Sequence, residues 1–432
     1  MSQLLIKDAT DALGVVCDIR IVDQHITEMG SRLAPVEGET VVDARGLIAL
    51  PGLVDLHTHL REPGFEQSET ILSGSKSAAA GGFTAVHAMA NTSPVQDTAG
   101  VVEQVAALGR DAGFVDVVPV GAVTVGLEGK QLAELGAMAN SKARVRVFSD
   151  DGKCVHDPLL MRRALEYVKT FDGVIAQHAQ EPRLTEGAQM HEGAVSSELG
   201  LAGWPAVAEE SIIARDVLLA EHVGSRVHIC HLSTAGSVEI VRWAKARGID
   251  VTAEVTPHHL LLTDELARSY DPVYKVNPPL RTEADVLALR AALADGTIDI
   301  IATDHAPHPA DSKDCEWSAA AFGMLGLEIA LSVAQLVLVD SGLADWQRVA
   351  EVLAHNPASI GMLAEQGQAL AVGSVANLVL VDPARTRQIS GSASKSANNP
   401  YLGLNLPGEV RHTIYRGYRT VIDGQLAATG RN

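Results

Sequence analysis

The chain has 432 residues, of which 47% are hydrophobic and 20% are charged, so it is long and apolar enough to bury a large globular core. Its formal net charge of -19 disfavours a nucleic-acid or membrane-surface partner, which would need a basic face. A small anionic ligand stays compatible with this charge, because a local basic site can lie in an acidic protein. No apolar run approaches the roughly 20 residues that cross a bilayer.

Cysteine usage and the N-terminus favour a reduced, cytoplasmic setting. The four cysteines, at positions 17, 154, 230 and 315, are scattered and form no CxxC pair, unlike the cysteines of a disulfide scaffold. Residues 1–8 lack the basic stretch and the apolar stretch of a signal peptide. We therefore expect a cytoplasmic protein.

The two ends of the chain share a strand-and-turn pattern. Short apolar runs bounded by Gly and Pro predict N-terminal strands at 4–6, 15–22 and 40–43. The same pattern predicts C-terminal strands at 376–382, 410–417 and 420–424, and the Ser- and Asn-rich stretch 390–399 reads as a loop. We predict that residues 1–50 and 366–432 together form one small β-sandwich domain beside a central domain, 51–365.

The central residues alternate between apolar, β-branched runs and helical stretches. The eight runs are 53–59, 83–90, 115–124, 145–150, 173–178, 227–233, 251–256 and 298–303. Strands that are apolar on both faces suit a parallel sheet covered by helices, and one connecting helix is bounded by a Ser233 or Thr234 cap and by Gly248. Eight such units predict an α/β fold with a (β/α)8 TIM-like barrel. A doubly wound sheet is the alternative, because periodicity alone does not show closure.

Histidine and aspartate side chains follow five of the eight predicted strands. They are His57 and His59, Asp150 and Asp151, His178, His231, and Asp304 with His305 and His308. His57 and His59 project from the same strand face, since they are two residues apart. Functional residues of a barrel gather at the C-terminal ends of its strands, so these side chains are expected at one rim.

The number of these groups predicts a two-metal site. Four histidines and two aspartates exceed the three protein ligands of a usual catalytic zinc, but they suit two metals bridged by a carboxylate and a hydroxide. Imidazole and carboxylate ligands favour zinc without excluding manganese or cobalt. Two divalent ions, two aspartates and one hydroxide leave a positive site, to which Arg61 adds. We therefore expect an anionic substrate whose carboxylate is held by Arg61.

With these residues assembled, the chain resembles the dihydroorotases of the amidohydrolase superfamily, of the aspartate-bridged bacterial type. The matching blocks are 51–64 (PGLVDLHTHLREPG), 81–84, 91–92, 148–152, 254–259, 277–281, 302–308 (ATDHAPH) and 322–323. They extend over nearly the whole chain. The HLREPG and ATDHAPH blocks are very specific together, whereas HxH alone is shared across the superfamily.

The resemblance implies two Zn²⁺ per subunit and assigns roles by position. The metal ligands that it implies are His57, His59 and Asp304 for the first zinc, His178 and His231 for the second, and Asp151 as the bridge, with adjacent Asp150 as the alternative. The implied substrate contacts are Arg61, Asn91 and His308 to the carboxylate, and Asn277, Phe322 and Gly323 to the ring. We expect Asp304 to be the catalytic proton carrier, and segment 309–321 to be a mobile lid.

The implied reaction is the reversible hydrolysis of the cyclic amide of (S)-dihydroorotate to N-carbamoyl-L-aspartate, in de novo pyrimidine (UMP) biosynthesis. A homodimer and association with an aspartate transcarbamoylase are further expectations. Two alternatives stay open: another cyclic-amide hydrolase, such as a hydantoinase or allantoinase, and a catalytically silent scaffold that binds a transcarbamoylase. Arg61, Asn91 and His308 disfavour the first, since neutral rings need no carboxylate clamp, and the complete ligand set disfavours the second.

Overall fold

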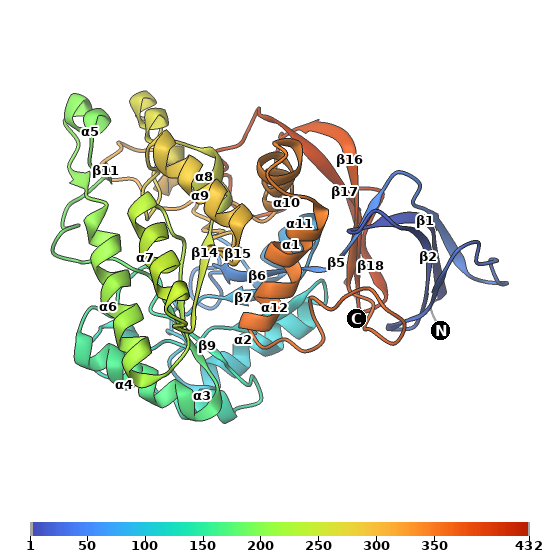
Figure 1. The fold of residues 1–432 in the computed structure, drawn as a ribbon, viewed down its shortest axis with the longest axis horizontal. Coiled ribbons are helices and arrows are strands. Elements are labelled where there is room, and N and C mark those ends of the chain that lie inside the picture. The colour runs from blue at the N-terminus through green and yellow to red at the C-terminus, as the bar shows by residue number, and fades with distance from the viewer. Residues whose placement is uncertain (1–2, 431–432) are drawn as a thin grey trace.

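The computed structural model describes residues 3–430 and consists of a helix-covered barrel beside a sheet built from both termini (Figure 1). Each of the eight predicted runs contains a strand of the barrel. These strands are β6 (Leu53–Thr58), β7 (Phe83–Ala88), β8 (Asp116–Pro119), β9 (Val147–Phe148), β10 (Val174–Gln177), β13 (Val227–Ile229), β14 (Val251–Val255) and β15 (Ile300–Ile301). Neighbouring strands pair in parallel in the orders β6-β7-β8 and β9-β10-β13-β14-β15.

Two isolated parallel bridges close these two sheets into a ring. Gly121 pairs with Phe148 between β8 and β9, and Thr58 pairs with His305 between β6 and β15. Buried Asp55 reinforces the second junction, because its carboxylate accepts hydrogen bonds from the Thr303 backbone N–H at 2.9 Å and from the Thr58 hydroxyl at 2.6 Å. The barrel prediction is therefore confirmed, and the doubly wound alternative is wrong.

Helices cover the outside of the barrel (Figure 1). Their bounds are α1 (Ile71–Ala80), α2 (Ala99–Ala112), α3 (Leu135–Asn140), α4 (Pro158–Val168), α5 (Ala194–Leu199), α6 (Val207–Val223), α7 (Ala235–Ala246), α8 (Pro257–Leu261), α9 (Glu283–Asp295), α10 (Ala330–Ala334), α11 (Trp346–Ala350) and α12 (Asn356–Ile360). The predicted connecting helix is α7, and its cap is Thr234, whose hydroxyl accepts from the Ser237 N–H. No helix within residues 3–430 combines the length and the apolar character needed to traverse a bilayer.

The termini form one nine-stranded sheet in the order β19-β18-β17-β16-β5-β1-β2-β3, with β4 on β1. Its strands are β1 (Gln3–Asp11), β2 (Val16–Val22), β3 (His25–Gly30), β4 (Thr40–Asp43), β5 (Ile48–Pro51), β16 (Leu378–Gln388), β17 (Asn405–Tyr415), β18 (Tyr418–Ile422) and β19 (Gln425–Leu426). Strand β5 joins the two halves, because it pairs with β1 on one side and with β16 on the other. The division at residues 50 and 366 stays a prediction.

Side-chain alternation along β16 explains how this sheet attaches to the barrel. Leu378 and Leu380 pack into a small core with residues of β1 and β2, whereas Val379 and Val381 pack into the main core of the barrel. Successive strand residues face opposite sides of a sheet, so one strand serves both cores.

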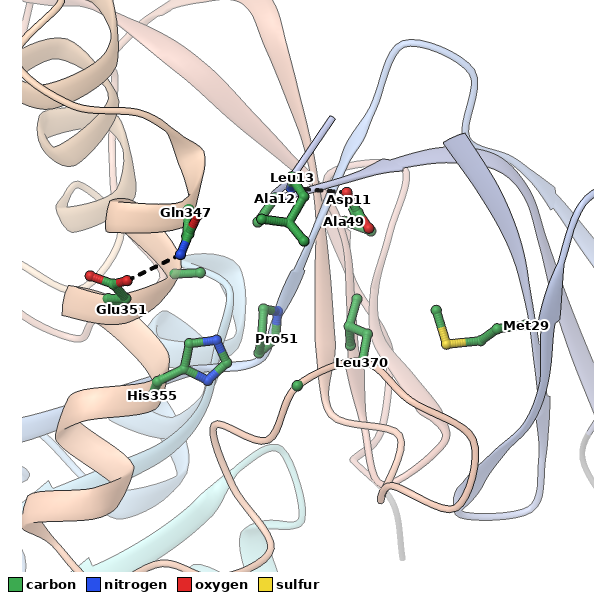
Figure 2. A pocket seen from close by; sticks show the side chains of 12 residues that line it. Asp11, Ala12, Leu13, Met29, Ala49, Pro51, Gln347, Glu351, His355 and Leu370 are labelled. Carbon is green, nitrogen blue, oxygen red and sulfur yellow. Dashed lines mark hydrogen bonds between the residues drawn. The ribbon is translucent and has the colours of Figure 1, made fainter. Parts of the chain in front are cut away.

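A cavity of about 270 Å³ lies at the junction of the two parts (Figure 2). Its walls include the apolar side chains of Leu13, Met29 and Leu370. The polar groups in its wall bond locally: Gln347 donates to Glu351 at 3.5 Å, and the His355 ring donates to the Gly367 carbonyl. This cavity therefore presents no cluster of reactive groups, and the predicted site lies elsewhere.

Candidate active site

All six predicted metal ligands meet at the C-terminal rim of the barrel. Three overlapping groups of predicted ligands have ligand atoms within 4.8 Å of one another: His57, His59 and Asp151; Asp151, His178 and His231; and His57, His231 and Asp304. A fourth group combines His57 with Cys230 and Glu254. All of these residues are buried. The strand-end argument placed the side chains at one rim, and the structure brings them into one cluster.

Asp151 lies at the centre of the cluster. One carboxylate oxygen, Oδ2, is 3.2 Å from His59 Nε2, and the other, Oδ1, is 3.2 Å from His178 Nδ1. The neighbouring Asp150 points elsewhere, because its carboxylate accepts from the backbone N–H groups of Val123 and Thr124 at 2.8 and 3.0 Å and from the Thr124 hydroxyl. The geometry thus places Asp151, and not Asp150, in the ligand cluster.

The electrostatics of the cluster fit a cation site. Burial raises the pKa of Asp151, but the His57 charge and hydrogen bonds from His178 outweigh burial and hold this pKa well below its usual value. Burial lowers the pKa of His57, but Asp151 and Glu254 outweigh it and raise this pKa well above its usual value. Yet His57 Nε2 is buried and finds no hydrogen-bond partner among residues 3–430. A divalent cation supplies both the positive charge and the missing partner, so the residues fit a metal.

Each of three ligand histidines has its second ring nitrogen occupied. His57 Nδ1 is 2.6 Å from Glu254 Oε1, His59 Nδ1 is 2.9 Å from Asn91 Oδ1, and His178 Nε2 is 2.8 Å from Gln180 Oε1. Such bonds fix the tautomer and the ring orientation, and they leave the inward nitrogen free for a metal.

Glu254 is the residue that sequence reasoning missed. Its other carboxylate oxygen, Oε2, accepts from His228 Nε2 at 2.9 Å, and His228 Nδ1 is 2.8 Å from Thr252 Oγ1. His228 belongs to none of the groups that could hold a metal ion among residues 3–430. The available signal was a buried-strand glutamate near the C-terminal end of β14, where the other residues are Val, Thr and Ala. Its partner on β6 is 197 residues away, so no local pattern links them.

A pocket of about 240 Å³ opens above the cluster. It is lined by His59, Arg61, Asn91, Asp151, Gly152, His178, Asn277, Asp304, Ala306, His308, Phe322 and Gly323. All six predicted substrate contacts are in this lining, together with four of the six predicted metal ligands. The two remaining ligands, His57 and His231, lie beneath it and are fully buried.

Arg61 carries positive charge in this pocket. Burial lowers its pKa to about 10, so the guanidinium is still charged at neutral pH. Its Nε donates to the Pro307 carbonyl at 3.1 Å. His308 is neutral, because burial and the Arg61 charge lower its pKa to about 3, and its Nε2 donates to the Phe322 carbonyl at 2.8 Å. The pocket can therefore take an anion at Arg61 beside a neutral imidazole.

Three residues of the site have left-handed backbone conformations that residues other than glycine rarely adopt. The φ angles are 64° for Arg61, 31° for His231 and 44° for Asp304. Such conformations cost roughly 1–3 kcal/mol each and persist where the surrounding structure imposes them. Here they accompany the turns that bring the guanidinium, the imidazole and the carboxylate to the rim.

The ring-contact candidates Asn277, Phe322 and Gly323 line the same pocket. The Asn277 carboxamide donates to Gln180 Oε1 at 3.2 Å, and its buried Oδ1 has no hydrogen-bond partner in the described chain. The Phe322 ring lies under the ammonium of Lys275, which is 4.5 Å from the ring centroid.

The predicted lid segment, 309–321, is hydrogen-bonded to residues 272–275. Lys313 Nζ donates to the Pro272 and Lys275 carbonyls, both at 2.9 Å, and Lys275 Nζ donates to the Trp317 carbonyl at 2.7 Å. Mobility of this segment stays a prediction. His258 and His259, which follow β14, are buried outside the pocket lining.

Comparisons with known proteins agree with this site. The family model "Dihydro-orotase-like" matches residues 46–237. A dihydroorotase of Leifsonia xyli is 69% identical, with 98% of this chain and 97% of that protein covered, and one of Streptomyces coelicolor is 68% identical, with 99% and 100% covered. One of Mycobacterium tuberculosis is 56% identical, with 95% and 96% covered.

Solved structures with the same fold are more distant in sequence. The L-hydantoinase (dihydropyrimidinase) of Arthrobacter aurescens has a TM-score of 0.87 at 24% identity, with 99% of this chain and 98% of that chain covered. The dihydropyrimidinase of Brevibacillus agri has a TM-score of 0.85 at 22% identity, with 98% and 96% covered. At these identities the likeness supports the barrel with its flanking terminal sheet and no shared substrate. The chain is 56% to 69% identical to these three dihydroorotases over nearly its full length. It therefore belongs to the dihydroorotase family of the amidohydrolase superfamily.

Proposed function

We propose that this chain hydrolyses the cyclic amide of (S)-dihydroorotate to N-carbamoyl-L-aspartate, reversibly, as a step of pyrimidine biosynthesis. One observation carries the proposal: charged Arg61 lies in the same pocket as the ligand cluster. The pocket can therefore bind a carboxylate next to a hydrolytic centre. Hydantoin and dihydrouracil lack this carboxylate, and they would leave the buried guanidinium without its anion.

The proposed cofactor is a pair of Zn²⁺ ions. His57, His59 and Asp304 would hold one ion, His178 and His231 the other, and Asp151 both. Bound there, the ions would provide hydroxide at neutral pH and polarise the amide carbonyl.

The residues around the cluster would orient the substrate and carry its proton. Arg61, Asn91 and His308 would hold the carboxylate. Asn277, Phe322 and Gly323, in the same pocket lining, would contact the ring. The Asp304 carboxylate, 3.0 Å from His59 Nε2 and open to the pocket, would take the proton of the attacking hydroxide. It would then deliver this proton to the ring nitrogen as the C–N bond breaks, which leaves a carboxylate and a ureido N–H.

The test compares a carboxylate-bearing ring with neutral rings on zinc-loaded protein. We expect turnover of dihydroorotate and little turnover of hydantoin or dihydrouracil. Arg61→Met should lower kcat/KM for dihydroorotate by about 10- to 150-fold, the worth of a charge-assisted hydrogen bond. Arg162→Met is the matched control, because this side chain is 42% exposed on the outer face of α4, and it should leave the rate unchanged. Equal losses on charged and neutral rings, or preferred hydrolysis of hydantoin, would contradict the proposal.

Four further expectations stay predictions: a homodimer, association with an aspartate transcarbamoylase, a cytoplasmic setting, and domain boundaries at 50/51 and 365/366. The four cysteines are free, as a reduced setting requires. Light scattering of the purified chain, alone and mixed with a transcarbamoylase, tests the first two.

A further inference from the structure

The connection between β16 and β17 leaves the terminal sheet and crosses the rim of the barrel. We call residues 392–399 of this connection the rim strap. Backbone and hydroxyl groups of the strap bond the barrel: the Ser392 hydroxyl donates to Glu328 Oε1 at 2.6 Å, the Lys395 N–H to Glu69 Oε1 at 3.0 Å, and the Ser396 hydroxyl to the Ser68 carbonyl at 2.6 Å. A segment predicted as a loop is therefore fixed against the barrel.

The strap ends on the wall of the proposed substrate pocket. Asn398 is 4% exposed, and its carboxamide Nδ2 donates to the carbonyls of Ala306 at 2.9 Å and of Gly323 at 3.1 Å. Its Oδ1 accepts from the His308 backbone N–H at 3.0 Å. Both donors and the acceptor of one side chain thus connect the segment after β15 to the segment at 322–325.

These two segments carry the proposed carboxylate and ring contacts, and they approach very closely. A Cβ atom placed on Gly323, whose φ is +146°, would lie 2.9 Å from the Ala306 carbonyl oxygen and 2.9 Å from His308 Cδ2. The His308 ring in turn donates to the Phe322 carbonyl. If the Asn398 carboxamide is removed, the Ala306 and Gly323 carbonyls and the His308 N–H lose their partners where this spacing is set, and the wall is free to separate.

We propose that Asn398 is a positioning residue for substrate binding: it sets the distance between His308 and Gly323 and so shapes the pocket wall near Arg61. The inference rests on the proposed function, because it assigns the effect to recognition of the carboxylate-bearing ring. Asn398 touches none of the six proposed metal ligands, so metal binding should be independent of it.

The test uses Asn398→Ala and Asn398→Asp, with Asn399→Ala as the matched control. Asn399 is the next residue of the strap and is 5% exposed, but its Oδ1 accepts only a local bond, from the Tyr401 N–H at 3.0 Å. Asn398→Asp keeps the size and the acceptor, and it loses the two donated bonds. If the alanine variant does not fold, the aspartate variant carries the test.

Both Asn398 variants should raise KM for dihydroorotate about tenfold or more, as expected when buried partners are left unpaired, with kcat within about threefold of wild type. Zinc content should stay unchanged, and the affinity for orotate, measured by calorimetry, should fall in parallel with KM. Asn399→Ala should move neither KM nor orotate affinity.

Three outcomes would overturn the inference: Asn398 variants that match Asn399→Ala, a loss confined to kcat, or a loss of zinc. Failure of the proposed function gives a different result. In that case the wild-type protein does not hydrolyse dihydroorotate, while the effect of Asn398→Asp on orotate binding can still be measured.

Discussion

Removal of the Glu254 carboxylate should weaken metal binding without removing any metal ligand. Glu254 is 1% exposed, and it contacts His57 Nδ1 at 2.6 Å, His228 Nε2 at 2.9 Å and the His231 N–H at 3.2 Å. Burial raises the pKa of this carboxyl, but His57 and His228 outweigh burial and hold the pKa well below its usual value. Glu254 is therefore ionised, and it keeps His57 oriented with Nε2 toward the cluster.

The expected magnitude follows from these contacts. Loss of a partner behind a metal-binding histidine costs about 10- to 100-fold in metal affinity, or about 1.4 to 2.7 kcal/mol. Glu254→Gln should lie at the low end, because its amide oxygen can still accept from His57. Glu254→Ala should lie at the high end, because His57 and His228 both lose their acceptor in a site that water reaches poorly.

The assay measures zinc retained by each purified variant against a graded concentration of chelator, and it does not depend on turnover. Asp216→Asn is the matched control: Asp216 is fully buried and accepts from Gln177 at 2.9 Å and Arg215 at 2.8 Å, but it bonds no proposed ligand. Zinc retention by Glu254→Ala equal to that of the wild-type protein and of the control would refute this role.

Three further outcomes are expected. Asp304→Asn should lower kcat by about 10²- to 10⁴-fold, the usual worth of a proton carrier, and near-normal turnover at full metal occupancy would exclude that role. Removal of metal by chelation should lower Tm, because a ligand that binds only the folded state stabilises it; an unchanged Tm would indicate that no metal was bound. Burial and the Lys275 charge lower the pKa of Lys313 from 10.5 to about 7. Between pH 7 and 10.5 the unfolded chain therefore binds more protons at Lys313 than the folded chain does. The free energy of unfolding of the wild-type protein, relative to that of Lys313→Met, should rise with pH over this range. If urea titrations give the same difference between the two proteins at every pH, the prediction is wrong.

Local sequence patterns determined the elements of this protein. Apolar, β-branched runs located all eight barrel strands, because a strand buried on both faces must be apolar along its length. The capping residues bounded α7 for an equally local reason. The strand-end rule then placed the four histidines and two aspartates of the predicted metal site on one rim, because the carboxyl ends of parallel strands lie at the same end of the barrel.

The tertiary structure decided what depends on contacts between distant segments. Ring closure rests on the Thr58–His305 bridge, which no periodicity encodes. The choice between Asp150 and Asp151 depends on Thr124, a residue from the neighbouring unit that occupies the Asp150 carboxylate. Glu254 and Asn398 act on partners 197 and 90 residues away, and a single sequence carries no signal for such pairs. The sequence by itself determined which groups reach the rim, and only the fold decided which atoms meet in the ligand cluster, which side chains support them, and which residues bond the pocket wall.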